Sequence, residues 1–416
     1  MRYSRVPFYE GKKMSERKER INAFVQAQLP VYQKISLAIH DKPEVSNYEF
    51  FASQTLSEQL SKEGFDIELP AAGHRTGFAA RYKSSLPGPV AVFLAEYDAL
   101  AGLGHGCGHN LFGATSSLAA AALKQVIDET GGEVRVYGTP GEEGGENGSA
   151  KGSFVREGYF KDVDFALCVH PGGDDKHYLS SRNYACAPVD ITFDGRAAHA
   201  AGDPQDGINA LDAQILVYNG ISVLRQQLTN RIRIHGIITE GGTAPNVIPE
   251  HTNSKWYIRA ADIDTLHELY AKVENIVKGA ALATGCTGSI RLYQNLVENM
   301  VVTPSLDAIY EKNLNLFGQQ ITHKPDTVQP GSSDVGNVSQ VVPAIQPHIG
   351  ISSTKIAGHS PDFVRAACSQ KGLDAIGLGA AVLADTALDL LEDEALLQKV
   401  REDHAWHVAH QKELPL

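Results

Sequence analysis

Apolar residues recur along this chain with two different periods, and the alternation between them predicts helices separated by strands. From residue 14 to about residue 62, the spacing of apolar positions is near 3.6, which is typical of helices. A second helical pattern begins at Asn110, a plausible N-cap, and runs to about Thr130. Short apolar or alternating runs predict strands at 65–69, 76–82, 89–95, 133–138 and 164–169. This order is typical of an α/β sheet.

The pattern changes between Pro188 and about Met300. Strands are predicted at 188–195, 232–238, 254–260 and 289–293, and helices at 207–230 and 263–284. Two helices on a small antiparallel sheet make a compact second domain, inserted into the first. We therefore expect a catalytic domain from residues 1–187 and 302–416, interrupted by an inserted domain at 188–301.

After the inserted domain the chain returns to the first pattern. A helix is predicted around 305–318, a Gly/Ser loop at 331–337, a strand at 344–351 and a mostly helical tail after residue 361. His404, His407 and His410 follow one another at every third position of this tail. We interpret them as surface residues of a helix.

Composition excludes several classes of function. Hydrophobic residues make up 43% and charged residues 21%, as in an ordinary globular protein, and the formal charge of −12 disfavours nucleic acid or an anionic membrane as partner. No apolar run is long enough to span a membrane, and the basic, polar N-terminus does not resemble a signal peptide. The five cysteines have no framework spacing, which favours a cytoplasmic location. The net charge says little about a small-molecule substrate, because local charge decides whether one binds.

The segment after the strand at 89–95 carries candidate metal ligands. Glu96 and Asp98 follow the strand, and then four alternate glycines, at 102, 104, 106 and 108, surround His105, Cys107 and His109. Thiolate and imidazole are the ligands that zinc-like ions prefer, and glycine lets the backbone wrap closely around an ion. From this segment alone, a Gly-rich turn with a buried cysteine and a surface histidine remains an alternative.

Other candidate ligands follow other strands. Glu142 and Glu143 come shortly after the strand at 133–138, and His170 comes directly after the strand at 164–169. Ligands in α/β sheets bind at the carboxyl ends of strands, so we expect these side chains to meet Cys107 and His109 in one site. Taken alone, the two glutamates would be read as an exposed acidic turn.

The ordered set of motifs resembles one family. The motifs are AEYDAL (95–100), GHGCGHN (104–110), TPGEEGG (139–145), VHP (169–171), FDGRAAHA (193–200), GGTAPNVIP (241–249), GSSDVGN (331–337) and AGHSPDF (357–363). The chain is similar to the dinuclear metallo-aminoacylases and carboxypeptidases, in the branch of p-aminobenzoyl-glutamate hydrolase, hippurate hydrolase and the indole-acetyl-amino-acid hydrolases. The resemblance implies a mixed-sheet α/β/α catalytic domain with an inserted α+β lid and dimerisation domain.

The resemblance also implies a metal site and a general base. It assigns two divalent ions per subunit, of Zn, Mn, Co or Ni, to five ligands: Cys107, His109, Glu143, His170 and His359. Cys107 is expected to bridge the ions, and Asp98 to orient a ligand histidine. Glu142 is expected to take a proton from the attacking water and pass it to the leaving amine.

The inserted domain is expected to contribute to substrate binding. The resemblance assigns His199 to the active site of a neighbouring subunit, which implies a homodimer or higher homo-oligomer, and assigns Asn246 and Arg259 to the carboxylate of the substrate. From the residues alone, His199 also suits a packed histidine at a helix start, Arg259 a surface ion pair and Asn246 a structural turn. Asn110 stands where many relatives have Asp, and the sequence AEYDALAGLGHGCGHN resembles that of the dipeptidase-like subgroup.

The expected function is metal-dependent hydrolysis of the amide bond in an N-acyl amino acid or dipeptide, including substrates like aminobenzoyl-glutamate. Two alternatives remain. Cys107 could act as a nucleophile with His109 as its base. The chain could also be a non-catalytic relative that binds a metal or a small ligand.

Overall fold

The computed structural model describes residues 14–229, 232–324, 327–329 and 331–413. The prediction that the N-terminus is not a signal peptide concerns residues 1–13 among others, and these lie outside the described ranges. Two compact units make up the described chain: one extends to Arg182 and includes 300–324, Thr327 and the chain from Asp334, and the other comprises 183–299 and 328–333. Within the described ranges, none of the helices combines the length and apolar character that crossing a membrane requires.

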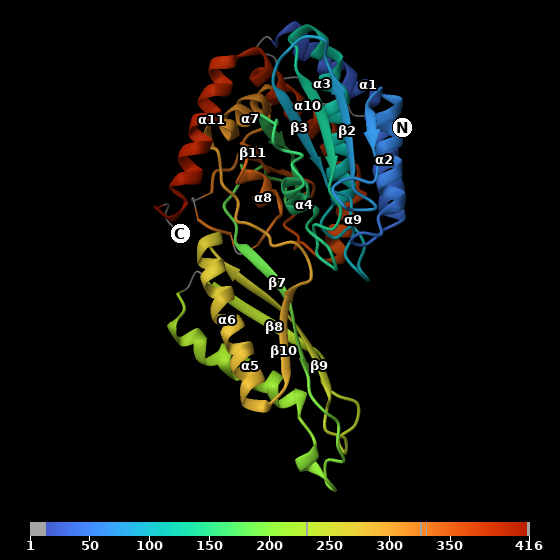
Figure 1. Ribbon diagram of the computed structural model, residues 1–416. Helices are drawn as coiled ribbons and strands as arrows, with labels where there is room; N and C mark the ends of the chain where they lie inside the picture. Colours follow the sequence, from blue (N-terminus) through green and yellow to red (C-terminus); the bar gives the residue numbers. More distant parts are fainter. Residues whose placement is uncertain (1–13, 230–231, 325–326, 330, 414–416) are drawn as a thin grey trace. The chain divides into compact units, whose positions relative to one another are not determined.

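The first unit is built on a six-stranded mixed sheet (Figure 1). Its strand order is β1-β2-β4-β3-β5-β11; β2 pairs antiparallel with both of its neighbours, and all the other pairs are parallel. The strands are β1 Asp66–Glu68, β2 Phe78–Lys83, β3 Val90–Ala95, β4 Glu133–Gly138, β5 Phe165–Leu167 and β11 Ala344–Ile345. The predicted α/β class with a mixed sheet is confirmed.

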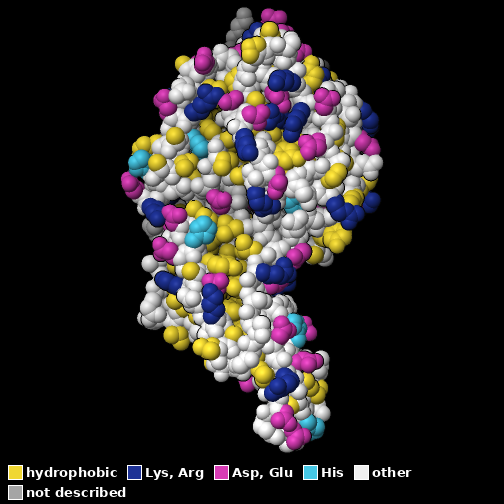
Figure 2. Space-filling view, viewed as in Figure 1, with side chains coloured by type: hydrophobic (Ala, Val, Ile, Leu, Met, Phe, Trp, Pro, Cys, Tyr) yellow, Lys and Arg dark blue, Asp and Glu magenta, His cyan; other side chains and the backbone are white. Residues whose placement is uncertain are grey.

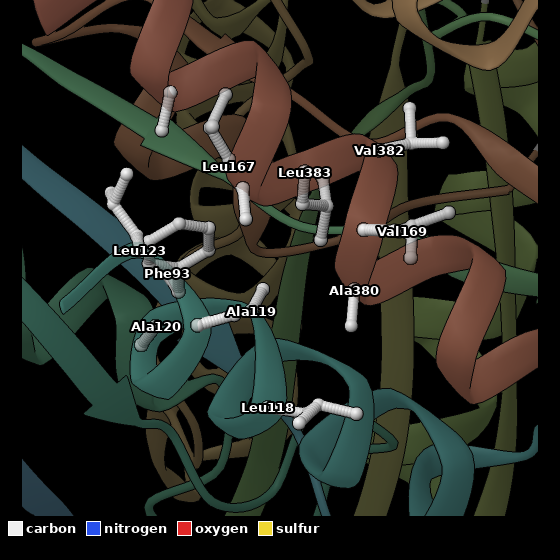
Figure 3. Packing of buried hydrophobic residues seen from close by; sticks show 14 of the residues in the cluster. Phe93, Leu118, Ala119, Ala120, Leu123, Leu167, Val169, Ala380, Val382 and Leu383 are labelled. Atoms are coloured by element: carbon white, nitrogen blue, oxygen red, sulfur yellow. The ribbon is translucent and has the colours of Figure 1, made fainter. Parts of the chain in front are cut away.

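The two faces of the sheet bury different helices because successive side chains of a strand point to opposite sides. Phe93 of β3 belongs to a hydrophobic cluster with residues of α1, α3 and α10, whereas its neighbours Val92 and Leu94 belong to a cluster with residues of α4 and α8. Figure 3 shows Phe93 beside Leu123 of α3, with Leu118, Ala119 and Ala120 on the same helix, Leu167 and Val169 in the same cluster, and Ala380, Val382 and Leu383 contributed by α10. Helices thus cover both faces.

The helices of this unit include two that the sequence pattern had merged. The stretch predicted as helical from 14 to 62 is interrupted around Pro43. The Glu44 carboxylate accepts hydrogen bonds from the N–H groups of Phe51 and Ala52 (2.8 and 3.0 Å), which caps the next helix. The helices are α1 Glu16–Asp41, α2 Phe50–Lys62, α3 His109–Thr130, α4 Ala150–Arg156, α7 Pro304–Leu316, α8 Val335–Ser339, α9 Pro361–Ala367, α10 Gln370–Glu392, α11 Glu394–Ala409 and the 3-10 turn Gln411–Glu413.

Three further predictions in this unit are corrected. The strand expected at 344–351 is divided: β11 belongs to the main sheet, whereas β12 (His348–Gly350) pairs parallel with β6 (His170–Gly172), and Pro347 between them has no N–H to donate to a ladder. The Gly/Ser loop at 331–337 contains the start of α8. His404 is 7% exposed and its Nε2 lies 2.7 Å from the carbonyl oxygen of Ser339, so it is not a surface residue.

The second unit has its own sheet and core. Its four strands are antiparallel in the order β10-β7-β9-β8 (Figure 1). Apolar residues of β7 and β9 pack against α5 and α6 in one cluster, as the alternating pattern of 254–260 predicts. The elements are β7 Ala185–Asp194, β8 Ile232–Glu240, β9 His251–Ala260, β10 Thr287–Leu292, α5 Ala210–Leu224, α6 Ile263–Thr284 and the 3-10 turns Pro204–Asp206 and Arg225–Gln227. The helix predicted at 207–230 therefore ends earlier, and Asn230 lies outside the described residues.

Charged side chains of both signs are interspersed over the face of the molecule that Figure 2 shows. That face carries no extended basic region.

Candidate metal centre

The carboxyl ends of three neighbouring parallel strands carry the candidate ligands of the first unit. β3 lies between β4 and β5 and runs parallel to both, so the residues that follow these strands lie along the same edge of the sheet. Glu96 follows β3 directly, the segment with Glu142 follows β4, and His170 follows β5 after two residues. The topology therefore accounts for the meeting of residues that lie far apart in the sequence.

His109 is the first residue of α3, and its ring is oriented by Asp98. Gly108, which precedes the helix, has φ +79°, and a Cβ there would lie 2.9 Å from Pro171 Cγ, so glycine is required. His109 Nδ1 lies 2.8 Å from Asp98 Oδ1. Because a carboxylate only accepts, Nδ1 carries the hydrogen and Nε2 has a free lone pair in the neutral ring. Asn110 does not cap the helix; its amide donates to Ser36 Oγ instead.

The charges around His109 decide its protonation. Burial lowers the pKa of His109, but the carboxylate of Asp98 and the groups of Cys107 and Glu96 outweigh burial and raise the pKa well above its ordinary value. Burial raises the pKa of Asp98, and the neighbouring His109 lowers it below the ordinary value. The pocket therefore favours a positive charge at His109, from a proton or from a bound cation.

Cys107 and His170 face each other across the site. Cys107 Sγ lies 3.4 Å from His170 Nε2, and His170 Nδ1 lies 2.8 Å from the carbonyl oxygen of Pro171. The carbonyl fixes the hydrogen on Nδ1, so Nε2 is again the free lone pair. Burial lowers the pKa of His170 to about 4, and burial raises that of the Cys107 thiol well above its usual range, with Glu143 adding to the increase.

The two glutamates after β4 have different neighbours. Glu143 Oε2 lies 3.4 Å from His359 Nε2, whereas Glu142 Oε2 lies 3.9 Å from His109 Nε2. Gly141 and Gly144 have positive φ values of +67° and +109°, which let the backbone turn twice around this pair. Burial raises the pKa of Glu142 well above its ordinary value, and the carboxylates of Glu96 and Glu143 raise it further.

Hydrogen bonds to carboxylates fix this loop on either side of Glu142. The N–H of Glu143 donates to Asp98 Oδ2 (2.9 Å), and the N–H of Gly141 donates to Glu49 Oε1 (2.9 Å). Glu49 is fully buried and also accepts a hydrogen bond from the Thr76 hydroxyl at 2.9 Å. Burial raises the pKa of Glu49 to about 8, with Asp98 as the second cause. Asp98 therefore orients both His109 and Glu143.

His359 reaches the site from the loop before α9. Its backbone has φ +55°, an uncommon value for a residue with a side chain, and its N–H donates to the carbonyl oxygen of Gly106 at 2.9 Å. The side chain is 57% exposed. A strained backbone held beside the loop of Cys107 is consistent with a functional position for this imidazole.

These residues form overlapping groups suited to a metal ion. Ligand atoms lie within 4.8 Å of one another in three groups, which are Cys107–His109–His170, Cys107–Glu143–His359 and Glu96–His109–Glu142. The first two groups share Cys107 and contain all the ligands predicted in this unit. The structure therefore brings the five predicted ligands together, with the cysteine in the shared position.

Two observations test whether the residues suit metal ions. Ligands on one tetrahedral ion, with bonds of about 2.0–2.3 Å, lie about 3.3–3.8 Å apart, and the Cys107–His170 and Glu143–His359 atom pairs are each separated by 3.4 Å. In addition, His109 Nε2 and Glu143 Oε1 are buried without a hydrogen-bond partner among the described residues. Buried polar atoms are costly without a partner, and a cation would satisfy both. The residues fit the predicted group.

The substrate residues predicted in the second unit lie at two places. His199 is exposed; its Nδ1 accepts hydrogen bonds from the N–H groups of Ala201 (3.2 Å) and Gly202 (2.9 Å), which leaves Nε2 free to donate. The N–H of Ala200 donates to the carbonyl oxygen of Asn246, so His199 and Asn246 are neighbours.

Arg259 lies apart from these two residues, near the C-terminal end of β9. Its Nη1 donates to Ser332 Oγ at 2.7 Å, and its guanidinium carbon lies 5.0 Å from the centre of the Tyr257 ring. The start of β9, His251, pairs with Asp194, five residues before His199. Arg259 is the eighth residue after His251 along the strand, a distance of roughly 27 Å at about 3.4 Å per residue. His199 and Arg259 are thus at opposite ends of the sheet.

Comparison with known proteins shows which family the chain belongs to. Residues 183–284 match the model of a peptidase dimerisation domain, M20_dimer. The chain is 36% identical to a mouse (Mus musculus) protein named Xaa-Arg dipeptidase, with 89% of this chain and 88% of the mouse protein covered. It is 30% identical to one of the p-aminobenzoyl-glutamate hydrolase chains of Escherichia coli (strain K12), with 92% and 94% covered. The chain belongs to the M20 peptidase family.

Solved structures show the same fold. An aminobenzoyl-glutamate utilization protein from Klebsiella pneumoniae superposes with a TM-score of 0.71 at 19% identity, covering 89% of this chain and 98% of that one. A Bacillus subtilis protein described as a dinuclear metal-binding peptidase of the M20 family gives 0.60 at 19% identity, covering 88% and 99%. The predicted family and architecture are confirmed, and this M20 peptidase is a metal-dependent amidohydrolase.

The motifs did not identify every residue that shapes the site of this M20 peptidase. Glu96, Lys151 and Asp334 form a buried chain of ion pairs, in which Lys151 Nζ lies 2.7 Å from Glu96 Oε1 and 2.6 Å from Asp334 Oδ1. The sequence did indicate that Glu96 follows a predicted strand, two residues before Asp98, and this position could have marked it as a residue of the site. Nothing in the sequence near Lys151 indicated that its ammonium group is buried beside two carboxylates.

Proposed function

We propose that this M20 peptidase hydrolyses the amide bond of a dipeptide or an N-acyl amino acid, including substrates like aminobenzoyl-glutamate, and releases a free amino acid. Two ligand groups that share Cys107, with Glu142 beside them, carry the proposal. The relatives named Xaa-Arg dipeptidase and p-aminobenzoyl-glutamate hydrolase support a substrate with a free carboxylate next to the cleaved bond.

Cys107, His109, Glu143, His170 and His359 would hold two divalent ions of the Zn, Mn, Co or Ni type, since thiolate, imidazole and carboxylate suit several of these metals. When bound, such ions polarise the carbonyl group of the amide and make water a nucleophile near neutral pH. The remaining task for the protein is to move protons and to hold the substrate.

Glu142 is positioned to move the proton. Its carboxylate takes the proton of the attacking water at Oε2 and passes it to the amine nitrogen as the bond to the carbonyl carbon breaks. Burial and the neighbouring carboxylates raise the pKa of Glu142, which makes its carboxylate a stronger proton acceptor than an exposed glutamate. The hydrogen bonds of Gly141 and Glu143 to Glu49 and Asp98 keep the loop from turning Glu142 away.

The second unit supplies substrate recognition in the proposal. Arg259 pairs with the substrate carboxylate, a role that suits a guanidinium oriented by Ser332 and the Tyr257 ring. His199, with Nε2 free to donate, polarises the scissile carbonyl, and Asn246 assists. Because His199 and Arg259 lie at opposite ends of one sheet, the two residues of a single subunit cannot both contact one small substrate. This separation and the matched dimerisation domain support a homodimer in which His199 serves the partner's site.

The two alternatives receive less support. As a nucleophile Cys107 would need to be a thiolate, yet burial and Glu143 raise its pKa, and only a nearby cation would reverse this. A protein that only binds a ligand has no use for a buried, oriented Glu142 beside the ligand groups. The nucleophile alternative also does not account for two ligand groups that share Cys107.

The test is the Glu142→Gln variant, with Glu146→Gln on the same loop as matched control. We expect Glu142→Gln to keep its metal content, measured by plasma mass spectrometry, and to lose at least about 100-fold in kcat, because general-base catalysis contributes that much or more. The control should retain both metal and activity. A fully active Glu142→Gln variant would refute the proposed mechanism. Amide hydrolysis that survives metal removal but stops on thiol alkylation would favour the Cys107 nucleophile.

A further inference from the structure

Glu96 is a buried carboxylate that the proposed mechanism does not use. It follows β3 directly, is fully buried, and carries one oxygen toward each of two partners. Glu96 Oε1 lies 2.7 Å from Lys151 Nζ, and Glu96 Oε2 lies 3.2 Å from His109 Nε2. Burying a carboxylate costs several kcal/mol or more unless it is paired, so a fully buried one at this position requires an explanation.

In the neutral state of the His109 ring, the contact between Glu96 and His109 joins two acceptors. Asp98 holds the hydrogen of the neutral His109 ring on Nδ1, which leaves a lone pair on Nε2 facing Glu96 Oε2. Neither Nε2 nor Oε2 has a hydrogen-bond partner in the part of the chain that the structure describes. Two buried acceptors at this distance repel each other unless a proton or a cation lies between them. The site thus offers a position for one positive species.

We propose that Glu96 is a further ligand of the metal ion bound to His109, since Glu96, His109 and Glu142 form one of the three groups of ligand atoms. The 3.2 Å separation of Glu96 Oε2 and His109 Nε2 is close to the edge of about 3.3 Å expected for a tetrahedral ion with bonds of about 2.0 Å. It also resembles the 3.4 Å separation of Cys107 Sγ and His170 Nε2. The inference rests on the proposed function, since it extends the ligand set that the proposal assigns.

Lys151 and Asp334 explain how Glu96 is held for this role. Lys151 is fully buried; its ammonium group bridges Glu96 Oε1 and Asp334 Oδ1, and its N–H donates to Asp334 Oδ2 at 3.1 Å. The bridge occupies one oxygen of Glu96 and leaves the other as a single, oriented donor. It also offsets the negative charge that a thiolate and two carboxylates would otherwise concentrate in a buried site. Lys151 is therefore a positioning residue.

Glu142 is the other carboxylate near His109, and the two differ in ways that divide their roles. Glu142 Oε2 is 3.9 Å from His109 Nε2, its side chain is 12% exposed, and it lies on a glycine-rich loop. Glu96 is closer, has no exposure, and follows a central strand of the sheet directly. A fixed, dry carboxylate suits a ligand, whereas a carboxylate that reaches solvent suits the exchange of protons with water.

The experiment counts metal ions and measures their affinities. Wild type, Glu96→Gln and Asp385→Asn are stripped of metal, titrated with Zn²⁺ against a chromophoric chelator, and analysed by plasma mass spectrometry; Asp385→Asn is the control, because it makes the same change at a buried carboxyl in α10. We expect two ions in wild type and in the control. Glu96→Gln should weaken one ion by roughly 100-fold and leave the other unchanged, since even outer partners of ligands contribute 10–100-fold.

Further variants identify which ion is lost and guard against misfolding. His109→Asn should weaken the same ion as Glu96→Gln, and the variant with both changes should lose no second ion, whereas His359→Asn should weaken the other ion. Glu96→Asp keeps the charge opposite Lys151 but withdraws the carboxylate by one methylene, and it should show the same selective loss if the glutamine variant does not fold. Loading with Co²⁺ should give a changed visible absorption spectrum in both Glu96 variants.

The outcomes separate this inference from the proposed function. A wild-type protein that binds fewer than two ions per subunit would contradict the proposed metal centre itself. A wild type with two ions, together with a folded Glu96→Gln variant that binds both with unchanged affinity and an unchanged Co²⁺ spectrum, would overturn the inference alone. In that case a proton shared with His109 would explain the contact.

Discussion

Replacing Asp98 with Asn tests how far one carboxylate organises the metal centre. Asp98 accepts a hydrogen bond from His109 Nδ1 at 2.8 Å and from the N–H of Glu143 at 2.9 Å, so its two oxygens orient one residue of each proposed ligand group. An asparagine has only one carbonyl oxygen, and its NH₂ group must face the second donor. Whichever way the amide turns, one buried N–H loses its acceptor.

The expected magnitude follows from that lost acceptor. A buried N–H without a partner costs about 1–3 kcal/mol, which corresponds to roughly 5-fold to 150-fold at about 1.4 kcal/mol per factor of ten. We therefore expect Asp98→Asn to weaken metal binding by about 10–100-fold, the range typical of residues that orient ligands. At saturating metal, kcat/KM should fall less, because bound ions partly restore the orientation of His109.

The assay is a competition titration with a chromophoric chelator, followed by kinetics over a range of metal concentrations. Asp307→Asn is the matched control: Asp307 is also buried and accepts two hydrogen bonds, from the hydroxyl (2.8 Å) and the N–H (3.4 Å) of Ser180. The control should change thermal stability without changing metal affinity. If Asp98→Asn bound metal as tightly as wild type, the argument that Asp98 orients the ligands would be wrong.

Four further predictions concern other parts of the account. Burial raises the pKa of Asp385 to about 7, far above about 3.9 in the unfolded chain, so its contribution to stability is complete below about pH 4 and is lost as pH rises through 7. Thermal denaturation should show Asp385→Asn to be more stable than wild type by up to about 4 kcal/mol at pH 8 and by about 1.5 kcal/mol at pH 5, with little difference at pH 3. Equal stability at pH 8 and pH 3 would contradict the burial argument. Arg259→Lys should raise KM by about 10-fold or more for substrates with a free carboxylate and leave kcat nearly unchanged; a C-terminally amidated substrate that responds equally would exclude carboxylate recognition. His359→Asn should bind one ion fewer while folding normally, because Asn tolerates a positive φ, and a full complement of two ions would remove His359 from the ligand set. Mixing inactive His199→Ala and Glu142→Gln subunits should restore about a quarter of wild-type activity, since half of the random dimers are mixed and each has one complete site; no recovery after verified subunit exchange would contradict a role in trans.

The sequence was sufficient to predict most of the fold because the apolar periods follow the layers of the structure. β3 reads as a continuous apolar run because Phe93 packs on one face of the sheet and Val92 and Leu94 on the other. β9 alternates because only one of its faces packs on helices. The break before Phe50 was missed because a helical period continues on both sides of Pro43, and the capping role of Glu44 depends on contacts that a periodicity does not contain.

The candidate site was partly predictable for a related reason. Cys107, His109, Glu142, Glu143 and His170 follow strands, and the parallel pairing of those strands brings the residues together.

What the sequence did not indicate was which buried polar residues complete the site. Lys151 and Asp334 are 183 positions apart, and their pairing with Glu96 depends on how α4 and the chain before α8 pack against the sheet. In the same way, His404 looked like a surface residue because its partner, the carbonyl oxygen of Ser339, lies 65 positions away. Such contacts are set by tertiary packing and leave no local pattern.

The most direct test of the central claim is a measurement of amide hydrolysis as a function of bound metal. Purified protein, stripped of metal and then loaded stepwise with Zn²⁺, Mn²⁺, Co²⁺ or Ni²⁺, is incubated with dipeptides, N-acyl amino acids and aminobenzoyl-glutamate, and the released amine is measured by mass spectrometry. The account predicts no release without metal, and release from at least one of these substrates that rises to a plateau at two ions per subunit. Release from the metal-free protein, or none from any substrate after loading with each metal, would contradict it.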